Sequence, residues 1–134
     1  MFPLGEEFGW RGFAHPRMVR RYGPVRGCLM LGAAWGLWHL AYAITPQAAG
    51  FDPFVFVLTL VELPLYALII GWVFERANRS MAVAIALHAG AHLDHIEWAP
   101  RTDLRIHVLH ILVLAAVAVA AAVSLSRRRA ISAG

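Results

Sequence analysis

Four long apolar segments follow a short polar motif in this chain. They cover residues 27–44, 53–74, 80–98 and 106–126, and they contain few formal charges. Each has about 18–22 residues, the length with which an α-helix crosses the hydrocarbon core of a bilayer. Thr45 and Pro46 end the first segment, because proline disfavours helix in the residue before it. The pattern predicts an all-α, polytopic transmembrane bundle of four spans plus a partial, motif-bearing N-terminal helix.

Composition supports lipid as the solvent of this chain. Of 134 residues, 60% are hydrophobic and 15% are charged, too apolar a balance for a soluble domain of this size. We therefore expect a single transmembrane domain over residues 1–134, with membrane lipids as its surroundings. The net charge of +4 does not predict a nucleic-acid partner, because the arginines lie between the apolar segments rather than along one stripe.

The placement of arginine predicts the orientation in the membrane. The loop between the first two spans and the loop between the last two spans carry only Arg101 and Arg105. The segments before the first span, between the second and third spans, and after the fourth span carry nine arginines: Arg17, Arg20, Arg21, Arg26, Arg76, Arg79, Arg127, Arg128 and Arg129. An excess of arginine marks the cytoplasmic side. We expect a multi-pass protein of the cell membrane whose basic loops and C-terminus are cytoplasmic.

Five ionisable side chains lie at a common predicted depth. Counted from the nearest cytoplasmic arginine at 1.5 Å per helical residue, they are roughly 14–21 Å into the bilayer; they are Glu6, His39, Glu62, His88 and His92. Ionisable residues at such depth usually face the bundle interior and serve function. We predict that Glu6 and the three histidines face one shared cavity. Because Met1 would then also lie inside the bilayer, we expect the first helix to be incomplete at its N-terminus.

The adjacent carboxylates of Glu6 and Glu7 have different expected roles. On a helix, Glu7 and Arg11 are i,i+4 neighbours in the favoured acid-first order. Glu6 points about 100° away on such a helix and has no local partner, so it is the carboxylate available for proton transfer. Glu62 precedes Pro64 and is interpreted as a supporting residue that lines the cavity or bonds to a neighbouring helix.

His88 and His92 are also i,i+4 neighbours, a spacing that lets two imidazoles meet one metal ion or one substrate group. His39 is alone on its segment. An interhelical hydrogen bond is the plainer interpretation of any single histidine in a membrane. The common depth with Glu6 favours a functional site for the set.

Three motifs together resemble the CPBP family of intramembrane metalloproteases, which includes type II CAAX prenyl endopeptidases and bacteriocin-processing or bacteriocin-immunity relatives. They are Glu6-Glu7-x-x-x-Arg11, Trp35-x-x-x-His39 and His88-x-x-x-His92. The resemblance covers nearly the whole chain in motif order, spacing and intervening spans. The sequence departs from the family at His92, where asparagine is usual, and in its incomplete first helix.

The resemblance implies hydrolysis of a peptide bond in a membrane-associated, prenylated or processed peptide or protein substrate. It implies that Glu6 is the general base, that His39 and His88 hold a zinc ion or polarise the water directly, and that His92 completes the metal site or stabilises the oxyanion. His39, His88 and His92 are thus the implied zinc ligands. Glu7 and Arg11 would lock the first helix against its neighbours.

Two other functions are compatible with the same sequence. The first is a non-catalytic bacteriocin-immunity or membrane interaction protein on this scaffold, although the intact Glu-Glu motif and the histidines argue against a loss of activity. The second is a haem protein with two histidine ligands, because histidines at mid-membrane on separate helices also suit haem ligation. A Soret band in the absorption spectrum would identify haem.

Overall fold

The computed structural model describes residues 3–44, 53–93 and 104–133, and within these ranges it contains helices and no strand. The elements are α1 (Pro3–Glu7), the π-helix η1 (Phe8–Ala14), α2 (His15–Tyr22), α3 (Pro24–Trp38), the 3₁₀-helix η2 (His39–Ile44), α4 (Pro53–Arg76), α5 (Met81–Leu93) and α6 (Leu104–Ala133). The predicted all-α class is confirmed.

Two of the four predicted spans have the length and composition to cross a membrane. They are Phe56–Arg76 in α4 and Leu104–Arg127 in α6, and 28% and 22% of the residues in their most apolar windows are buried. The helix α3 has 15 residues and is followed by η2, and α5 has 13 residues. The predicted third span extended to residue 98, and its residues 94–98 lie outside the described ranges.

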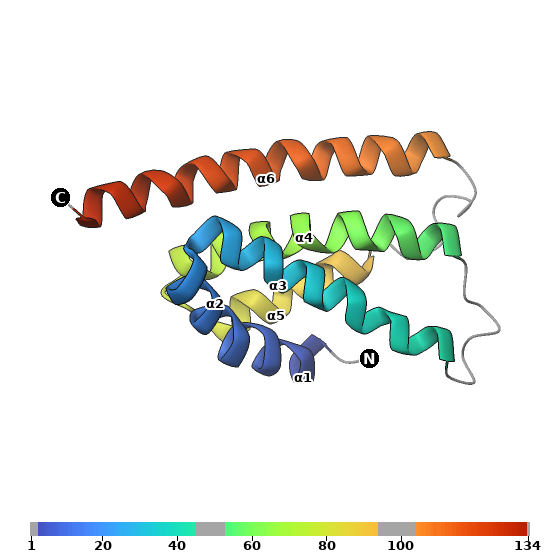
Figure 1. Ribbon diagram of the computed structural model, residues 1–134, viewed down its shortest axis with the longest axis horizontal. Coiled ribbons are helices and arrows are strands. Elements are labelled where there is room, and N and C mark those ends of the chain that lie inside the picture. Colours follow the sequence, from blue (N-terminus) through green and yellow to red (C-terminus); the bar gives the residue numbers. More distant parts are fainter. Residues whose placement is uncertain (1–2, 45–52, 94–103, 134) are drawn as a thin grey trace.

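On one side of the bundle, helices α3, α4 and α6 pack against one another, and α6 runs alongside α4 (Figure 1). Their common core contains Cys28, Leu68, Ala118, Ala121 and Leu125. On the other side, α3 and α4 pack with α5 through Trp35, Ile70, Phe74 and Ala84. Large apolar side chains remain exposed along the outer face of α6, as expected of a helix surrounded by lipid.

The N-terminal segment contains the predicted motif-bearing helix. The elements α1, η1 and α2 form one continuous helical run over residues 3–22. Gly23 ends this run with a φ of 85°, a left-handed conformation that glycine adopts without a Cβ clash. Pro24 then starts α3, which returns alongside the first run (Figure 1).

The arginine-rich ends of three helices lie together. The start of α3 and the C-terminal ends of α4 and α6 are at the same end of the bundle (Figure 1). There, Arg76 donates to Ser124 Oγ at 3.1 Å, and Nε2 of the buried His15 lies 3.2 Å from Oε1 of Glu75. The second contact joins the motif-bearing helical run to α4.

Candidate active site

A buried ion pair fixes the start of the motif helix. Arg11 Nη1 donates to Glu7 Oε1 at 2.7 Å, and both side chains are inaccessible to solvent. The predicted i,i+4 pair is therefore confirmed as a contact. It spans the junction of α1 with the π-helix η1, a rare geometry that often occurs at functional sites. The Arg11 guanidinium also lies 5.1 Å from the centre of the Trp35 ring.

Glu7 has a second partner on a distant helix. His88 Nδ1 of α5 lies 2.8 Å from the same oxygen, Glu7 Oε1. His88 is 1% exposed. A carboxylate can only accept hydrogen bonds, so Nδ1 of His88 carries the proton and Nε2 points away from Glu7. One carboxylate thus binds Arg11 and also sets the orientation of the His88 ring.

Glu6 receives its partners from α3 and α5. Trp35 Nε1 donates to Glu6 Oε2 at 3.2 Å, and His88 Nε2 lies 3.9 Å from the same oxygen. The sequence predicts no local partner for Glu6, and the contacts with Trp35 and His88 come from other helices. The contact from Trp35 was missed, although its position four residues before His39 belongs to the second motif.

His92 extends the site by one helical turn. Its Nε2 lies 3.2 Å from Nε2 of His88, and the two rings are stacked with centroids 5.0 Å apart. His92 is exposed, whereas His88 is buried. Because Nδ1 of His88 faces Glu7, a neutral His88 accepts the hydrogen bond and His92 donates it. The tip of the His92 ring therefore reaches the same region as Glu6.

His39, the first residue of η2, contacts the rings of two tryptophans of α3. Its Nδ1 lies 2.9 Å from the backbone carbonyl oxygen of Trp35, to which it donates. The His39 ring is 6.3 Å from the Trp35 ring and 5.4 Å from the Trp38 ring, centre to centre. Trp35 thus contacts His39 as well as Glu6 and His88.

The predicted zinc ligands do not form a metal centre in this arrangement. Among the residues that the structure describes, no group of three or more histidine, cysteine, aspartate or glutamate side chains is positioned to hold a metal ion. Both nitrogens of His88 have close partners, Glu7 and His92, and Nδ1 of His39 is bonded to backbone. These donors do not fit zinc as they stand, and zinc binding stays a prediction.

Glu62, predicted as a supporting residue, contacts a different helix from the ones that the Glu6–His88 pair joins. Its Oε1 is 3.6 Å from Nδ1 of His110 in α6, and Nε2 of His110 is 3.0 Å from the hydroxyl oxygen of Tyr66. Of its two expected placements, these distances favour bonding between neighbouring helices. The Glu62–His110 contact joins α4 to α6, whereas the Glu6–His88 pair joins α1 to α5.

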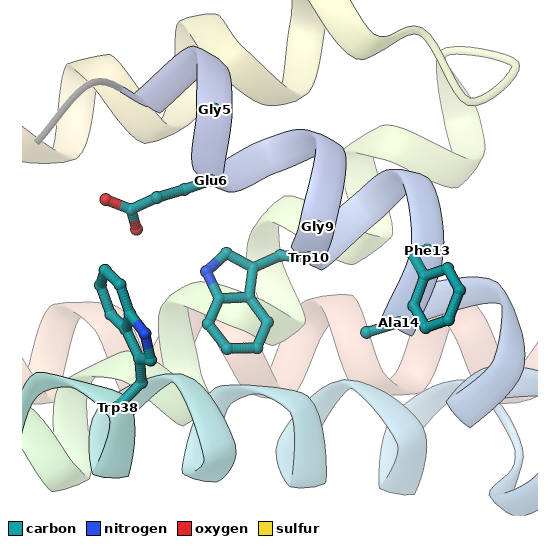
Figure 2. Close-up of a pocket in the computed structure, with 7 residues that line it drawn as sticks. All are labelled: Gly5, Glu6, Gly9, Trp10, Phe13, Ala14 and Trp38. Atoms are coloured by element: carbon teal, nitrogen blue, oxygen red, sulfur yellow. The ribbon is translucent and has the colours of Figure 1, made fainter.

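A cavity of about 640 Å³ adjoins Glu6. Figure 2 shows the Glu6 carboxylate beside the rings of Trp10 and Trp38, with Gly5 and Gly9 along the helix above them. The volume falls within the usual range for binding pockets, about 300–1,000 Å³. Apart from Glu6, the described residues that line the cavity are small or aromatic: Gly5, Gly9, Trp10, Phe13, Ala14 and Trp38.

The described residues form a helical bundle with two membrane-length helices and a buried glutamate–histidine cluster. These features are those of a helical membrane protein with a polar site inside the bundle. Comparison with known proteins identifies the family. The family model described as Type II CAAX prenyl endopeptidase Rce1-like matches residues 1–93, so the chain belongs to this family. The match covers α1 to α5 and leaves α6 outside it. The family and the apolar helices place the protein in a membrane.

One curated relative supports the same assignment. The chain is 28% identical over 122 residues to a protein of Methanococcus maripaludis named CAAX prenyl protease 2. The alignment covers 85% of this chain and 44% of the relative, so the chain spans less than half of that protein's length. No solved structure matches the chain.

Proposed function

We propose that this chain carries the catalytic centre of an intramembrane endopeptidase of the CAAX type, which hydrolyses a peptide bond in a membrane-associated, prenylated substrate. Membership of the family and the name of the relative support the reaction class. One observation about the chain itself carries the proposal: Glu6 Oε2 faces Nε2 of His88 at 3.9 Å. Glu7 holds the opposite side of that imidazole at 2.8 Å.

The gap between Glu6 and His88 suits the attacking water. Glu6 Oε2 and the unprotonated Nε2 of His88 are both acceptors and cannot bond to each other. At 3.9 Å, one water can donate to both once it takes the place of the His92 N–H group at His88 Nε2. In the proposed reaction, Glu6 takes one proton as the water oxygen attacks the scissile carbonyl carbon. Glu6 then returns that proton to the amide nitrogen as the carbon–nitrogen bond breaks.

The other polar residues have supporting roles in this mechanism. Glu7 keeps His88 in the tautomer whose Nε2 accepts a hydrogen bond from the water. The Nε2–H group of His92, which donates to His88 Nε2 in the structure, is the proposed donor to the oxyanion during the reaction. It would turn from His88 to the oxyanion and leave His88 Nε2 to the water. His39 is given no proton-donating role, because its Nδ1–H already donates to the backbone carbonyl oxygen of Trp35. No step uses zinc, since the described donors do not fit it.

The proposal is tested with Glu6→Gln in the full-length protein reconstituted in liposomes. The substrate is a fluorescence-quenched peptide ending in a farnesylated CAAX sequence. Loss of general-base catalysis should lower kcat by about 10²–10⁴-fold. Glutamine retains an acceptor for Trp35 Nε1, so the thermal midpoint should stay close to that of the wild type. Full activity of Glu6→Gln would exclude Glu6 as the base. No turnover by wild-type protein would favour the non-catalytic immunity or interaction protein.

We further propose that the arginine-rich end of the bundle is cytoplasmic. A membrane-impermeant maleimide can test this, because the natural cysteine, Cys28, is fully buried and serves as a silent background. Ser80→Cys, between α4 and α5, should react only when the cytoplasmic side is accessible. Thr102→Cys, in the opposite loop of the sequence, should react from the other side. The reverse labelling pattern would contradict this orientation.

A further inference from the structure

The cavity beside Glu6 has a chemical character that the peptide-bond chemistry does not explain. Hydrolysis requires polar groups around the scissile bond, but the cavity is lined by the Trp10, Phe13 and Trp38 rings and by small residues. Among the described residues of its wall, Glu6 alone has an ionisable side chain. An occupant must therefore present an apolar group to the rings while a neighbouring peptide bond lies at Glu6.

Two glycines leave open the space for such a group. Gly5 and Gly9 are four residues apart, and both line the cavity. A Cβ built on either residue meets no atom within 4 Å. Close packing explains other glycines of the chain: a Cβ on Gly32 would lie 2.4 Å from the Cα of Pro64. Close packing does not explain Gly5 or Gly9. Glycine is unfavourable inside a helix, so its presence at these two positions needs another reason.

Open space alone does not identify a binding position. Gly90 of α5 also has no atom within 4 Å of a built Cβ, and it is not among the residues that line the cavity. What distinguishes Gly5 and Gly9 is that added side chains would enter a cavity that has the proposed general base in its wall. The two glycines therefore control the volume available next to the reaction.

We propose that Gly5 and Gly9 determine substrate specificity by admitting a long apolar chain attached to the substrate beside the scissile bond. This inference rests on the proposed function. The occupant is one apolar chain in contact with Trp10, Phe13 and Trp38. A large aliphatic side chain of the peptide and a thioether-linked isoprenoid on cysteine share this chemistry. The size of the accepted chain depends on the absence of side chains at positions 5 and 9.

The test compares Gly9→Ala and Gly9→Leu with matched changes at Gly12. A Cβ on Gly12 is 3.9 Å from the carbonyl oxygen of Glu7, an ordinary contact, and Gly12 does not line the cavity. Two series of quenched peptides carry graded chains beside the scissile bond, one with linear aliphatic side chains and one with isoprenoids. The series that shows a length optimum in wild-type protein identifies the source of the chain.

For that series, Gly9→Leu should lower kcat/KM for the longest chains by about tenfold or more and leave the shortest nearly unchanged. Gly9→Ala should have a smaller effect in the same direction, and Gly12→Ala and Gly12→Leu should keep the wild-type length profile. An unchanged profile in Gly9→Leu would overturn the proposal even if Glu6→Gln confirms the endopeptidase activity.

A binding measurement separates failure of this inference from failure of the proposed function. A cysteine derivative bearing a diazirine-tagged farnesyl or alkyl chain is photo-crosslinked to full-length protein in liposomes, with no requirement for turnover. Labelled residues identified by mass spectrometry should include Trp10, Phe13 or Trp38, and Gly9→Leu should remove that labelling while Gly12→Leu retains it. Labelling elsewhere only, or labelling insensitive to Gly9→Leu, would reject the site whether or not the protein is an active protease.

Discussion

His88 Nδ1 lies 2.8 Å from Glu7 Oε1, and this contact joins the motif helix to α5 across 81 residues of sequence. The same oxygen accepts from Arg11 Nη1 at 2.7 Å. Glu7 therefore stabilises the fold and also orients a proposed catalytic imidazole. A substitution of Glu7 cannot remove one role and keep the other, because both contacts use the same oxygen, Oε1.

Replacing Glu7 by glutamine should consequently affect stability and activity together. Glu7→Gln leaves the buried Arg11 charge without its counterion, a change that costs about 3–5 kcal/mol when one partner of a buried pair is removed. Thermal unfolding in detergent should show a clear decrease in the midpoint. Turnover should also fall at temperatures where the protein is folded, because His88 loses the carboxylate that aligns it.

The matched comparison for that variant is Glu6→Gln, which removes the adjacent carboxylate but no buried ion pair. It should reduce activity with little change in the thermal midpoint. Neutralising the cation as well, with Glu7→Gln/Arg11→Met, should restore part of the lost stability, since no buried charge is then left alone. If Glu7→Gln unfolds at the wild-type temperature, the ion pair has little structural importance.

The indole of Trp35 is expected to position the Glu6 carboxylate. Trp35→Phe keeps an aromatic ring, which in the wild type lies 4.7 Å from the His88 ring, but removes the N–H that donates to Glu6 Oε2. Hydrogen bonds to charged groups contribute about 1.5–3 kcal/mol, so kcat should fall by roughly 10–100-fold. KM should change much less, because Trp35 does not line the cavity.

Trp72→Phe is the matched control for this variant. The Nε1 atom of Trp72 is buried and has no hydrogen-bond partner among the described residues, so the same chemical change removes no hydrogen bond there. Its kcat should equal that of the wild type. A Trp35→Phe enzyme with unchanged kcat, or one with only KM altered, would contradict the positioning role.

Spacing within one helix was sufficient to predict part of the site. The contacts Glu7–Arg11 and His88–His92 are i,i+4 pairs, and the structure contains both. Such pairs follow from helical geometry whatever the helix packs against. The contact between Trp35 and Glu6 could not be derived in this way, because it depends on how α3 crosses the motif helix and on the π-helical segment η1.

Depth in the membrane predicted proximity only in part. Glu6, His88 and Glu62 have similar depths when counted along the sequence, yet the structure brings just the first two together. Counting residues gives the level along a helix axis and leaves the direction of the side chain open. Glu62 faces His110 of α6, a partner that no spacing rule connects to it. His39 shares the level too, but its Nδ1 is bonded to its own helix.

The close approach of α3 and α4 should depend on Gly32. A Cβ at this position would lie 2.4 Å from the Cα of Pro64 and 2.6 Å from the carbonyl oxygen of Leu63. These are backbone atoms, so the helices would have to separate. Gly32→Ala should lower the free energy of unfolding by about 1–3 kcal/mol, the usual range for overpacking. Urea unfolding of the detergent-solubilised protein measures this.

Gly90→Ala supplies the control for helix propensity alone. Its Cβ would meet no atom within 4 Å, and alanine is the better helix former, so stability should be unchanged or slightly increased. Equal stability of the Gly32→Ala and Gly90→Ala variants would mean that α3 and α4 can move apart without cost.

The residue at position 92 separates two possible roles of its side chain. If His92 donates to the oxyanion, His92→Asn should keep most of the activity, because the amide also carries a donor and is the residue usual in the resembled family. The hydrogen bond to His88 is not essential in that case, since Glu7 still holds the buried imidazole. His92→Ala, which has no donor, should lose about 10²–10³-fold in kcat.

If His92 instead binds zinc, His92→Asn removes an imidazole ligand for which a neutral amide is a poor substitute. Metal content and turnover of the full-length variant would then fall together, and excess zinc would restore part of the activity. We expect the first outcome, because His92 is exposed and faces His88 rather than a group of three ligands among the described residues. Zinc analysis and turnover of the asparagine and alanine variants, measured side by side, distinguish the two roles: loss of metal with activity in His92→Asn means that the histidine is a ligand.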